Sequence, residues 1–148
     1  MTLELDGESD TLALAGHIAT GLKSGMVIYL RGNLGSGKTT IVRGILESLG
    51  YKERVKSPTY TLVESYYVDG LYLRHFDLYR LQDPQEWESA GFRDEFDGSN
   101  IFFIEWPDKA GNLIPPADIE ISVEITASGR TARIQAKSEL GTQCLKQL

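Results

Sequence analysis

An eight-residue segment has the residue types and spacing that bind phosphate groups. Residues 32–39 read Gly-Asn-Leu-Gly-Ser-Gly-Lys-Thr and fit the pattern G-x-x-x-x-G-K-[ST]. In this pattern the glycines let consecutive backbone N–H groups point at phosphate oxygens, and the helix that follows adds its own unpaired N–H groups. Lys38 reaches the β- and γ-phosphates, while the hydroxyl of Thr39 ligates Mg²⁺. The segment therefore predicts binding of a nucleoside triphosphate with Mg²⁺.

The context of this loop agrees with that prediction. An accidental match to the pattern is expected in about one in a hundred chains of this length. Here the loop follows the apolar run Met26–Leu30 and precedes the amphipathic segment Lys38–Leu49, which predicts the strand–loop–helix arrangement that the chemistry requires. The chain has no N-K-x-D sequence of the kind that reads guanine, so ATP is the expected nucleotide.

Two acidic residues are candidates for binding Mg²⁺ or orienting water beside the phosphates. Glu105 ends a second apolar run, Ile101–Ile104, where proteins with such loops place an acid that holds Mg²⁺ directly or through water. Asp77 follows the expected strand Leu71–Phe76 and is a candidate to orient an attacking water. Each acid has a structural alternative: Glu105 as a solvated strand end, and Asp77 as a cap or a partner of Arg80.

Other candidate residues lie close to these acids in the sequence. Residues 57–61 come before an expected hairpin, where nucleotide switches reach the γ-phosphate with a threonine, and an ordinary loop is the alternative. The sequence favours core packing for Trp106, and the alternative is an exposed platform at the end of the strand. His75 is expected to be an ordinary strand residue with its hydrogen bonds made, not a catalyst. A histidine–cysteine metal site is excluded, because the chain has two histidines and one cysteine.

The surrounding pattern predicts the elements that position these residues. The two apolar runs are typical of buried parallel strands. Asp69-Gly70 predicts a tight turn between strands 60–68 and 71–76, and Ser128-Gly129 a turn between strands 119–126 and 130–137. Further expected elements are an edge strand over 3–5, a helix capped by Ser9 or Asp10, a helix over 84–90 and a short helix in the last ten residues. The expected fold is α/β and P-loop NTPase-like: a central, mostly parallel sheet extended by antiparallel hairpins, with helices on both faces.

Length and composition bound the class of protein. The 148 residues predict one domain over 1–148. The net charge of −6 and the scattered basic residues argue against a free-standing nucleic-acid binder, so a partner would hold any RNA. No apolar run approaches the roughly 20 residues of a transmembrane helix, and residues 1–6 lack a signal-peptide pattern, so a cytoplasmic protein away from membranes is expected. The single cysteine, Cys144, fits a reducing compartment and is expected to be half-exposed in the C-terminal tail.

Four segments together resemble the TsaE (YjeE-like) family of small bacterial ATPases. Residues 32–40 are similar to the family's phosphate loop, and residues 57–63, Ser-Pro-Thr-Tyr-Thr-Leu-Val, to its first switch. Residues 75–81, His-Phe-Asp-Leu-Tyr-Arg-Leu, are similar to its signature aspartate segment, and residues 104–107, Ile-Glu-Trp-Pro, to its glutamate–tryptophan pair. Order, spacing and chain length agree, and the last three segments are far more specific than the phosphate loop.

The resemblance implies an ATPase that is weak alone and takes part in making threonylcarbamoyladenosine at position 37 of tRNAs that read ANN codons. It implies association with the TsaB–TsaD transferase, and contact with tRNA only through that complex. Carried over by motif, Thr39 and Glu105 hold Mg²⁺, and the catalytic residues are Asp77, Lys38 and Thr61, the last in the switch. The implied nucleotide contacts, with Thr11 and Arg130 near the adenine, are Thr11, Gly35, Ser36, Gly37, Lys38, Thr39, Thr40, Trp106 and Arg130.

Two other functions stay open from the sequence. A small-molecule or nucleoside kinase would use the same loop, but such kinases usually carry a basic lid, and no arginine cluster reads as one. A binding module could hold ATP as a structural ligand only. No arginine is obviously placed to stabilise the charge that develops on the phosphates during hydrolysis. Arg80 and Arg93 are candidates for this role, and the alternative is that a partner protein completes the site.

Overall fold

The computed structural model describes residues 1–148, apart from the side chain of Gln147. Short helices of the 3₁₀ type, labelled η, supplement the strands and α-helices. The elements in chain order are β1 (Thr2–Leu5), α1 (Glu8–Ala19), β2 (Val27–Arg31), α2 (Lys38–Ser48), β3 (Val63–Val68), β4 (Leu71–Asp77), α3 (Pro84–Ser89), η1 (Phe92–Glu95), β5 (Asn100–Glu105), η2 (Pro107–Ala110), β6 (Ile119–Thr126), β7 (Gly129–Ala136), α4 (Glu139–Cys144) and η3 (Leu145–Gln147).

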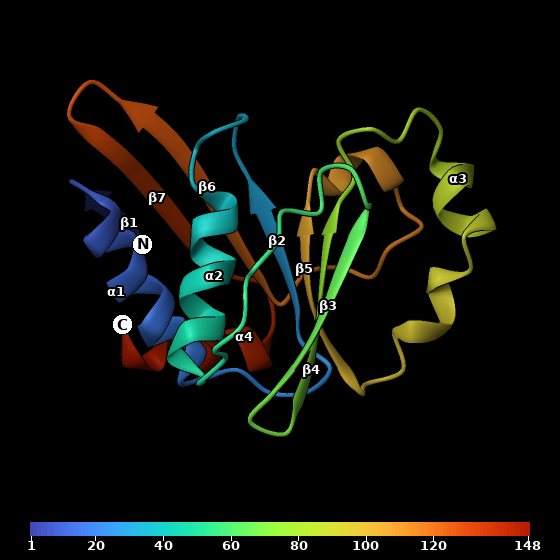
Figure 1. The fold of residues 1–148 in the computed structure, drawn as a ribbon, viewed down its shortest axis with the longest axis horizontal. Helices are drawn as coiled ribbons and strands as arrows, with labels where there is room; N and C mark the ends of the chain where they lie inside the picture. The colour runs from blue at the N-terminus through green and yellow to red at the C-terminus, as the bar shows by residue number, and fades with distance from the viewer.

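The strands form one seven-stranded sheet in the order β1-β7-β6-β2-β5-β4-β3 (Figure 1). Its centre is parallel, because β2 pairs in parallel with both β5 and β6, and β4 pairs in parallel with β5. The hairpins β3–β4 and β6–β7 are antiparallel and extend this centre, and β1 pairs antiparallel with β7 at the edge. The predicted fold class is confirmed in this arrangement. Parallel neighbours end at the same edge of the sheet, which is where the loop before α2 lies.

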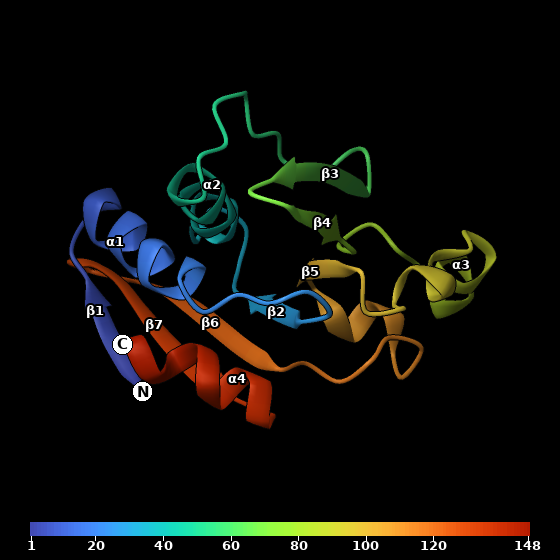
Figure 2. The same cartoon turned by 90° about the horizontal axis from the view of Figure 1, so that it is seen from below.

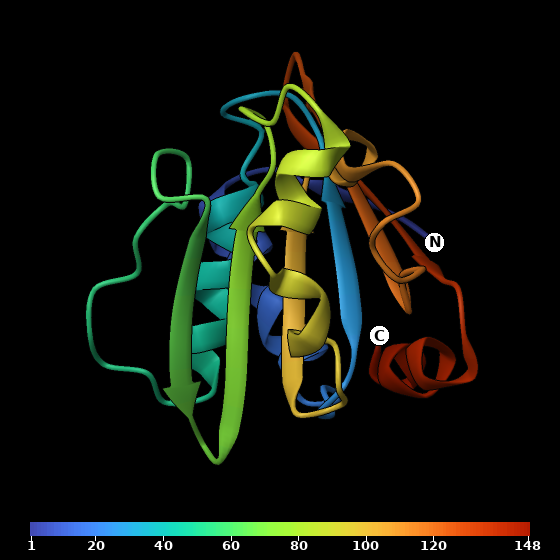
Figure 3. The same ribbon diagram turned by 90° about the vertical axis from the view of Figure 1, so that its right-hand side faces the viewer.

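Helices cover both faces of the sheet (Figures 2 and 3). On one face α1 and α2 pack over Ile28 and Leu30 of β2, and the helices approach so closely that an ideal Cβ at Gly44 would lie 2.7 Å from the Cβ of Ala15. On the other face α3, η1 and η2 cover Val27 and Tyr29 with an aromatic cluster. Successive side chains of β2 point to opposite faces of the sheet, which explains how one unbroken apolar run contributes to two cores.

Two element boundaries differ by more than one residue from the sequence-based prediction. Strand β3 begins at Val63 rather than at residue 60, because the chain first turns: the N–H of Leu62 donates to Pro58 O at 2.9 Å, and Leu62 has a φ of +72°. Helix α1 begins at Glu8 with Gly7 as its N-cap, so neither Ser9 nor Asp10 caps it. Instead the Asp10 carboxylate accepts a hydrogen bond from Asp6 N at 2.9 Å.

The prediction that Cys144 is half-exposed is wrong. Cys144 is only 1% exposed, and its Sγ lies 3.6 Å from Ile18 O at the end of α1. The reason is that α4 folds back onto the end of α1, and burial raises the pKa of the Cys144 thiol. The longest helix, α1, has 12 residues, and no helix in the described part of the chain has the length and apolar character needed to cross a bilayer.

Replacement of Gly141 by alanine is expected to destabilise the protein by about 1–3 kcal/mol, because a Cβ there would lie 2.0 Å from Asp118 O in the tight contact between α4 and the start of β6. Urea unfolding followed by circular dichroism measures this. Gly16→Ala is the matched control: Gly16 is also helical, and its Cβ would make only an ordinary contact, 3.6 Å from Ser48 Oγ. Equal stabilities of the two variants would contradict the prediction.

Candidate nucleotide-binding site

The glycine-rich loop joins the central strand β2 directly to α2. Gly35 and Gly37 have φ values of +78° and +110°, which residues with a side chain rarely adopt. Gly32 has a φ of +149°, and space is a further restriction there, since a Cβ would lie 2.6 Å from Val123 O. The loop then leads into an 11-residue helix whose first N–H groups have no partner within the helix. The backbone therefore has the shape and polarity of an anion site.

Lys38 lies inside this loop. The residue is 4% exposed, and its Nζ donates to Gly32 O. The ammonium also lies 3.6 Å from Glu105 Oε1 and 4.4 Å from the centre of the Trp106 ring. These contacts hold the positive charge at the mouth of the loop, where phosphate oxygens would bind.

Asp77 and Glu105 lie side by side at the ends of neighbouring strands. They are register partners in the parallel pair β4–β5, and both are buried. Asp77 accepts hydrogen bonds from Tyr79 N at 3.0 Å and from the Thr59 hydroxyl at 3.3 Å. Burial, reinforced by the charge of Glu105, raises the pKa of Asp77 above its usual range, although the Tyr79 N–H, Lys38 and Thr59 oppose this shift.

The two carboxylates and the loop enclose a common cavity of about 240 Å³. Thr39 and Thr40 at the start of α2 also line it, together with Ser57 and Thr59 from the segment before β3. Of the residues predicted from the sequence, the structure brings together here Gly35, Gly37, Lys38, Thr39, Thr40, Asp77 and Glu105.

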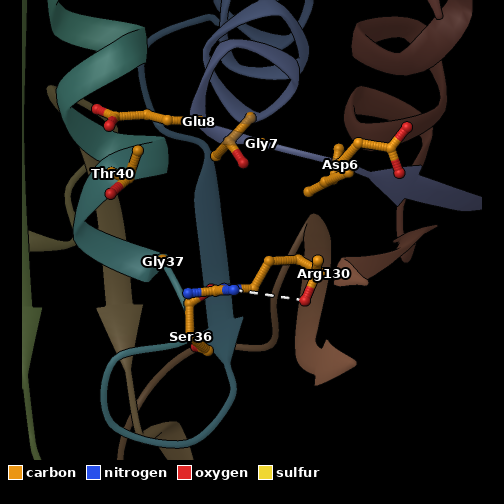
Figure 4. Close-up of a pocket in the computed structure, with 10 residues that line it drawn as sticks. Asp6, Gly7, Glu8, Ser36, Gly37, Thr40 and Arg130 are labelled. Atoms are coloured by element: carbon orange, nitrogen blue, oxygen red, sulfur yellow. Dashed lines mark hydrogen bonds between the residues drawn. The ribbon is translucent and has the colours of Figure 1, made fainter. Parts of the chain in front are cut away.

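A second cavity of about 190 Å³ lies beside the first, and Figure 4 shows the residues around it. Thr11 from α1 and Arg130 from β7 line it, together with Ser36, Gly37 and Thr40. Arg130 Nε donates to Ser36 O at 3.0 Å, and its Nη2 donates to Gly35 O at 3.3 Å. Gly37 and Thr40 line both cavities, so the two spaces adjoin at the start of α2.

Thr61 lies outside both cavities. It is exposed, and its hydroxyl donates to Glu64 Oε1 at 3.0 Å. Thr59 and Thr61 both lie in the turn that the hydrogen bond from Leu62 N to Pro58 O closes, and Thr59 is the one that reaches the site, where its hydroxyl donates to Asp77. The sequence of residues 57–61 carries no signal that distinguishes its two threonines.

Trp106 follows Glu105 with a φ of +56° and is half-buried. The ammonium of Lys38 lies over the Trp106 ring, and the centres of the Trp106 and Tyr79 rings are 5.1 Å apart. Neither candidate arginine lines the cavity beside Lys38: Arg80 stacks on the Tyr60 ring at 4.5 Å, and Arg93 pairs with Glu88 at 2.8 Å.

The residues present fit a phosphate chain and Mg²⁺. Ser36 Oγ is buried and has no hydrogen-bond partner, so a ligand bound at the loop could form a hydrogen bond with it. The Thr39 hydroxyl and the Glu105 carboxylate supply the oxygen ligands that Mg²⁺ prefers. The described residues contain no group of three or more His, Cys, Asp or Glu that would hold a metal ion alone. A Mg²⁺ ion here would therefore take its other ligands from phosphate and water.

The chain matches a family of known proteins over most of its length. The family profile described as "Threonylcarbamoyl adenosine biosynthesis protein TsaE" covers residues 5–134. The chain is similar to the tRNA threonylcarbamoyladenosine biosynthesis protein TsaE of Haemophilus influenzae, at 46% identity over 116 residues, which cover 78% of this chain and 73% of that protein. The protein of the same name from Aquifex aeolicus is 40% identical over 136 residues, which cover 90% of this chain and 94% of that protein.

A solved structure agrees with these sequence matches. The crystal structure of Bacillus subtilis YdiB superposes with a TM-score of 0.82 at 26% identity, covering 97% of this chain and 90% of that chain. The superposition covers almost the whole chain, and the range of the family profile, residues 5–134, contains the phosphate loop and both strand-end carboxylates. The chain belongs to the TsaE family.

Proposed function

We propose that this protein binds Mg-ATP in the loop of residues 32–39, hydrolyses it slowly, and serves as the ATPase subunit in threonylcarbamoyl modification of adenosine 37 in ANN-decoding tRNAs. The observation that carries the ATPase part is the shared cavity of about 240 Å³, which Lys38, Thr39, Asp77 and Glu105 all line. The pathway follows from membership of the family. The single free cysteine, which is buried, suits the reducing cytoplasm, where we place the protein.

Each residue has a distinct task in the proposed reaction. The loop N–H groups and Lys38 bind the β- and γ-phosphates and stabilise the charge that develops on them. Thr39 and Glu105 would hold Mg²⁺, which when bound neutralises phosphate charge. Asp77, anchored by the Tyr79 N–H, orients a water for in-line attack on the γ-phosphate.

The adjoining cavity is the proposed place of the adenine. Thr11 offers a hydroxyl and Arg130 a guanidinium beside the loop, and the cavity reaches the phosphates at Gly37 and Thr40. Arg130 already bonds to the carbonyls of Gly35 and Ser36, so it also braces the loop.

The proposed partner is the TsaB–TsaD transferase complex. Lys38 is the sole lysine or arginine that lines the phosphate cavity in the described part of the chain, so charge stabilisation by this chain alone is limited, which supports slow hydrolysis. Leu34, which lines the cavity, and Tyr60, which follows Thr59 in the chain, are 58% and 84% exposed, as expected of a surface that another protein covers. A net charge of −6 supports indirect rather than direct contact with tRNA.

The deciding experiment is phosphate release from Mg-ATP by the chain alone and then with TsaB and TsaD added. Slow release that changes with the partners is the expected result. A rate of phosphate release that stays the same when TsaB and TsaD are added would refute the proposed role in the complex, and the protein would be an ATPase without that role. Transfer of labelled phosphate to an acceptor molecule, instead of release to solution, would establish the kinase alternative.

Glu105→Ala is expected to weaken Mg²⁺-dependent ATP binding by about tenfold or more, because the cavity loses its carboxylate ligand. Binding in EDTA should be unchanged or slightly tighter, since Glu105 is also the carboxylate 3.6 Å from Lys38 Nζ and competes with phosphate for it. Calorimetric titration in both conditions measures the two affinities. The matched control is Glu53→Ala, which removes an exposed glutamate. Equal losses with and without Mg²⁺ would make Glu105 a structural residue.

A further inference from the structure

His75 and Glu105 form a buried pair across strands β4 and β5. His75 Nε2 lies 2.6 Å from Glu105 Oε2, and the two side chains are 0% and 5% exposed. The bond is short and lies in surroundings from which water is excluded, so it is strong and geometrically restrictive. The partner is a carboxylate, which accepts hydrogen bonds, so the proton of this contact belongs to Nε2.

The pair divides the two oxygens of Glu105 between two tasks. Oε2 is taken up by His75, while Oε1 faces Lys38 Nζ at 3.6 Å, on the side of the phosphate cavity. A glutamate side chain has three rotatable bonds and would otherwise sample several orientations at a strand end. With one oxygen fixed by the imidazole, the other is held toward the nucleotide side.

Packing alone does not account for a histidine at this position. Its Nδ1 is buried and has no hydrogen-bond partner, so the imidazole carries an unpaired polar atom into the core. A leucine would fill similar space without that penalty. The feature that the histidine adds is the N–H group directed at Glu105.

We propose that His75 is a positioning residue that aims Glu105 at the Mg²⁺–nucleotide complex. The proposal rests on the proposed role of Glu105 as a ligand of Mg²⁺. Groups that bond to a metal-ligating side chain fix its orientation, and their loss typically reduces metal affinity by about 10–100-fold. His75 itself does not line the cavity, so it acts through Glu105.

The test compares ADP affinity with Mg²⁺ and with EDTA, by calorimetry, so that hydrolysis plays no part. The ratio of the two affinities is the Mg²⁺ gain. His75→Leu should lower the gain about tenfold and leave affinity in EDTA unchanged. His75→Gln, whose amide N–H can replace Nε2–H, should keep most of the gain. In a Glu105→Ala background, His75→Leu should have no further effect.

The outcomes separate this proposal from the proposed function. A wild-type protein without a Mg²⁺ gain, or with a gain that survives Glu105→Ala, would refute the metal role of Glu105. A gain that is lost in Glu105→Ala but kept in His75→Leu would refute the positioning role alone. The positioning role would also be refuted if His75→Leu lost equal ADP affinity in Mg²⁺ and in EDTA, or if His75→Leu still lowered the affinity in the Glu105→Ala background. A His75→Gln variant with as small a Mg²⁺ gain as His75→Leu would refute it as well.

A measurement on the unaltered protein keeps the proposal testable even if His75→Leu does not fold. The chain has two histidines, and His17 is exposed, so the ring signals of His75 can be assigned by nitrogen-15 NMR. A long-range proton–nitrogen spectrum should show a proton on Nε2 that persists when Mg-ADP is added. A ring with its proton on Nδ1 alone would exclude the bond to Glu105 and overturn the proposal.

Discussion

Lys38→Ala is expected to lower ATP affinity by about 100-fold, or about 2.7 kcal/mol. The loss of the ammonium removes charge-assisted hydrogen bonds to two phosphates. It also leaves the buried carboxylates of Glu105 and Asp77 without their nearest cation, so the cavity becomes more negative and repels phosphate further. Calorimetric titration with a slowly hydrolysed ATP analogue and Mg²⁺ measures the change.

The control for this variant is Lys52→Ala, which removes an exposed lysine from the segment after α2. Lys52→Ala should bind as the unaltered protein does. Circular dichroism must show that Lys38→Ala remains folded, since the side chain is almost fully buried. An unchanged titration curve for folded Lys38→Ala would refute phosphate binding at this loop.

Asp77→Asn is expected to slow ATP hydrolysis by about 100-fold or more, because the amide cannot orient and polarise a water as the carboxylate does. Binding of Mg-ATP should change little, since Asn keeps an oxygen for the Tyr79 N–H and a similar shape. Phosphate release under single-turnover conditions, with ATP bound at saturation, separates the two effects. Hydrolysis at the unaltered rate would show that Asp77 is a structural residue, and would favour ATP as a structural ligand.

The same variant should be more stable than the unaltered protein at neutral pH. Burial raises the pKa of Asp77 in the folded state, so the folded protein binds this proton more tightly than the unfolded chain. The ionised carboxylate therefore costs stability, and the cost develops as pH rises above the ordinary aspartate pKa of about 4 and persists through neutral pH. Thermal unfolding should give Asp77→Asn the higher melting temperature at pH 7, with the difference shrinking toward pH 4. A lower melting temperature at pH 7 would contradict this.

The central part of the fold follows from local patterns. Residues 27–30 and 101–104 are unbroken apolar runs, and the structure buries them as adjacent parallel strands. Pro84 begins α3, as the sequence predicts, and the Asp83 side chain caps it. These features depend on neighbouring residues, so one sequence is enough to read them.

The parts that could not be predicted depend on contacts between distant segments. The β-branched and aromatic residues from Tyr60 onward favour a strand, but the bond from Leu62 N to Pro58 O imposes a turn and brings Thr59 to Asp77. Cys144 is buried only because α4 returns to α1. The bond between His75 and Glu105 joins residues 30 positions apart and needs the pairing of β4 with β5, which spacing along the chain does not supply.

The position of β2 in the sheet has a further consequence, which concerns local unfolding. β2 is bonded on both sides, by β5 and β6, whereas β3 is bonded on one side only, by β4. Amide protons in β2 can exchange with solvent only when the centre of the sheet opens, while those of β3 and the segment before it can exchange through smaller openings. The phosphate loop therefore follows a strand in the interior of the sheet, whereas Thr59 lies in the segment before an edge strand. A nucleotide in the cavity would therefore contact one side that opens rarely and another side that opens more readily.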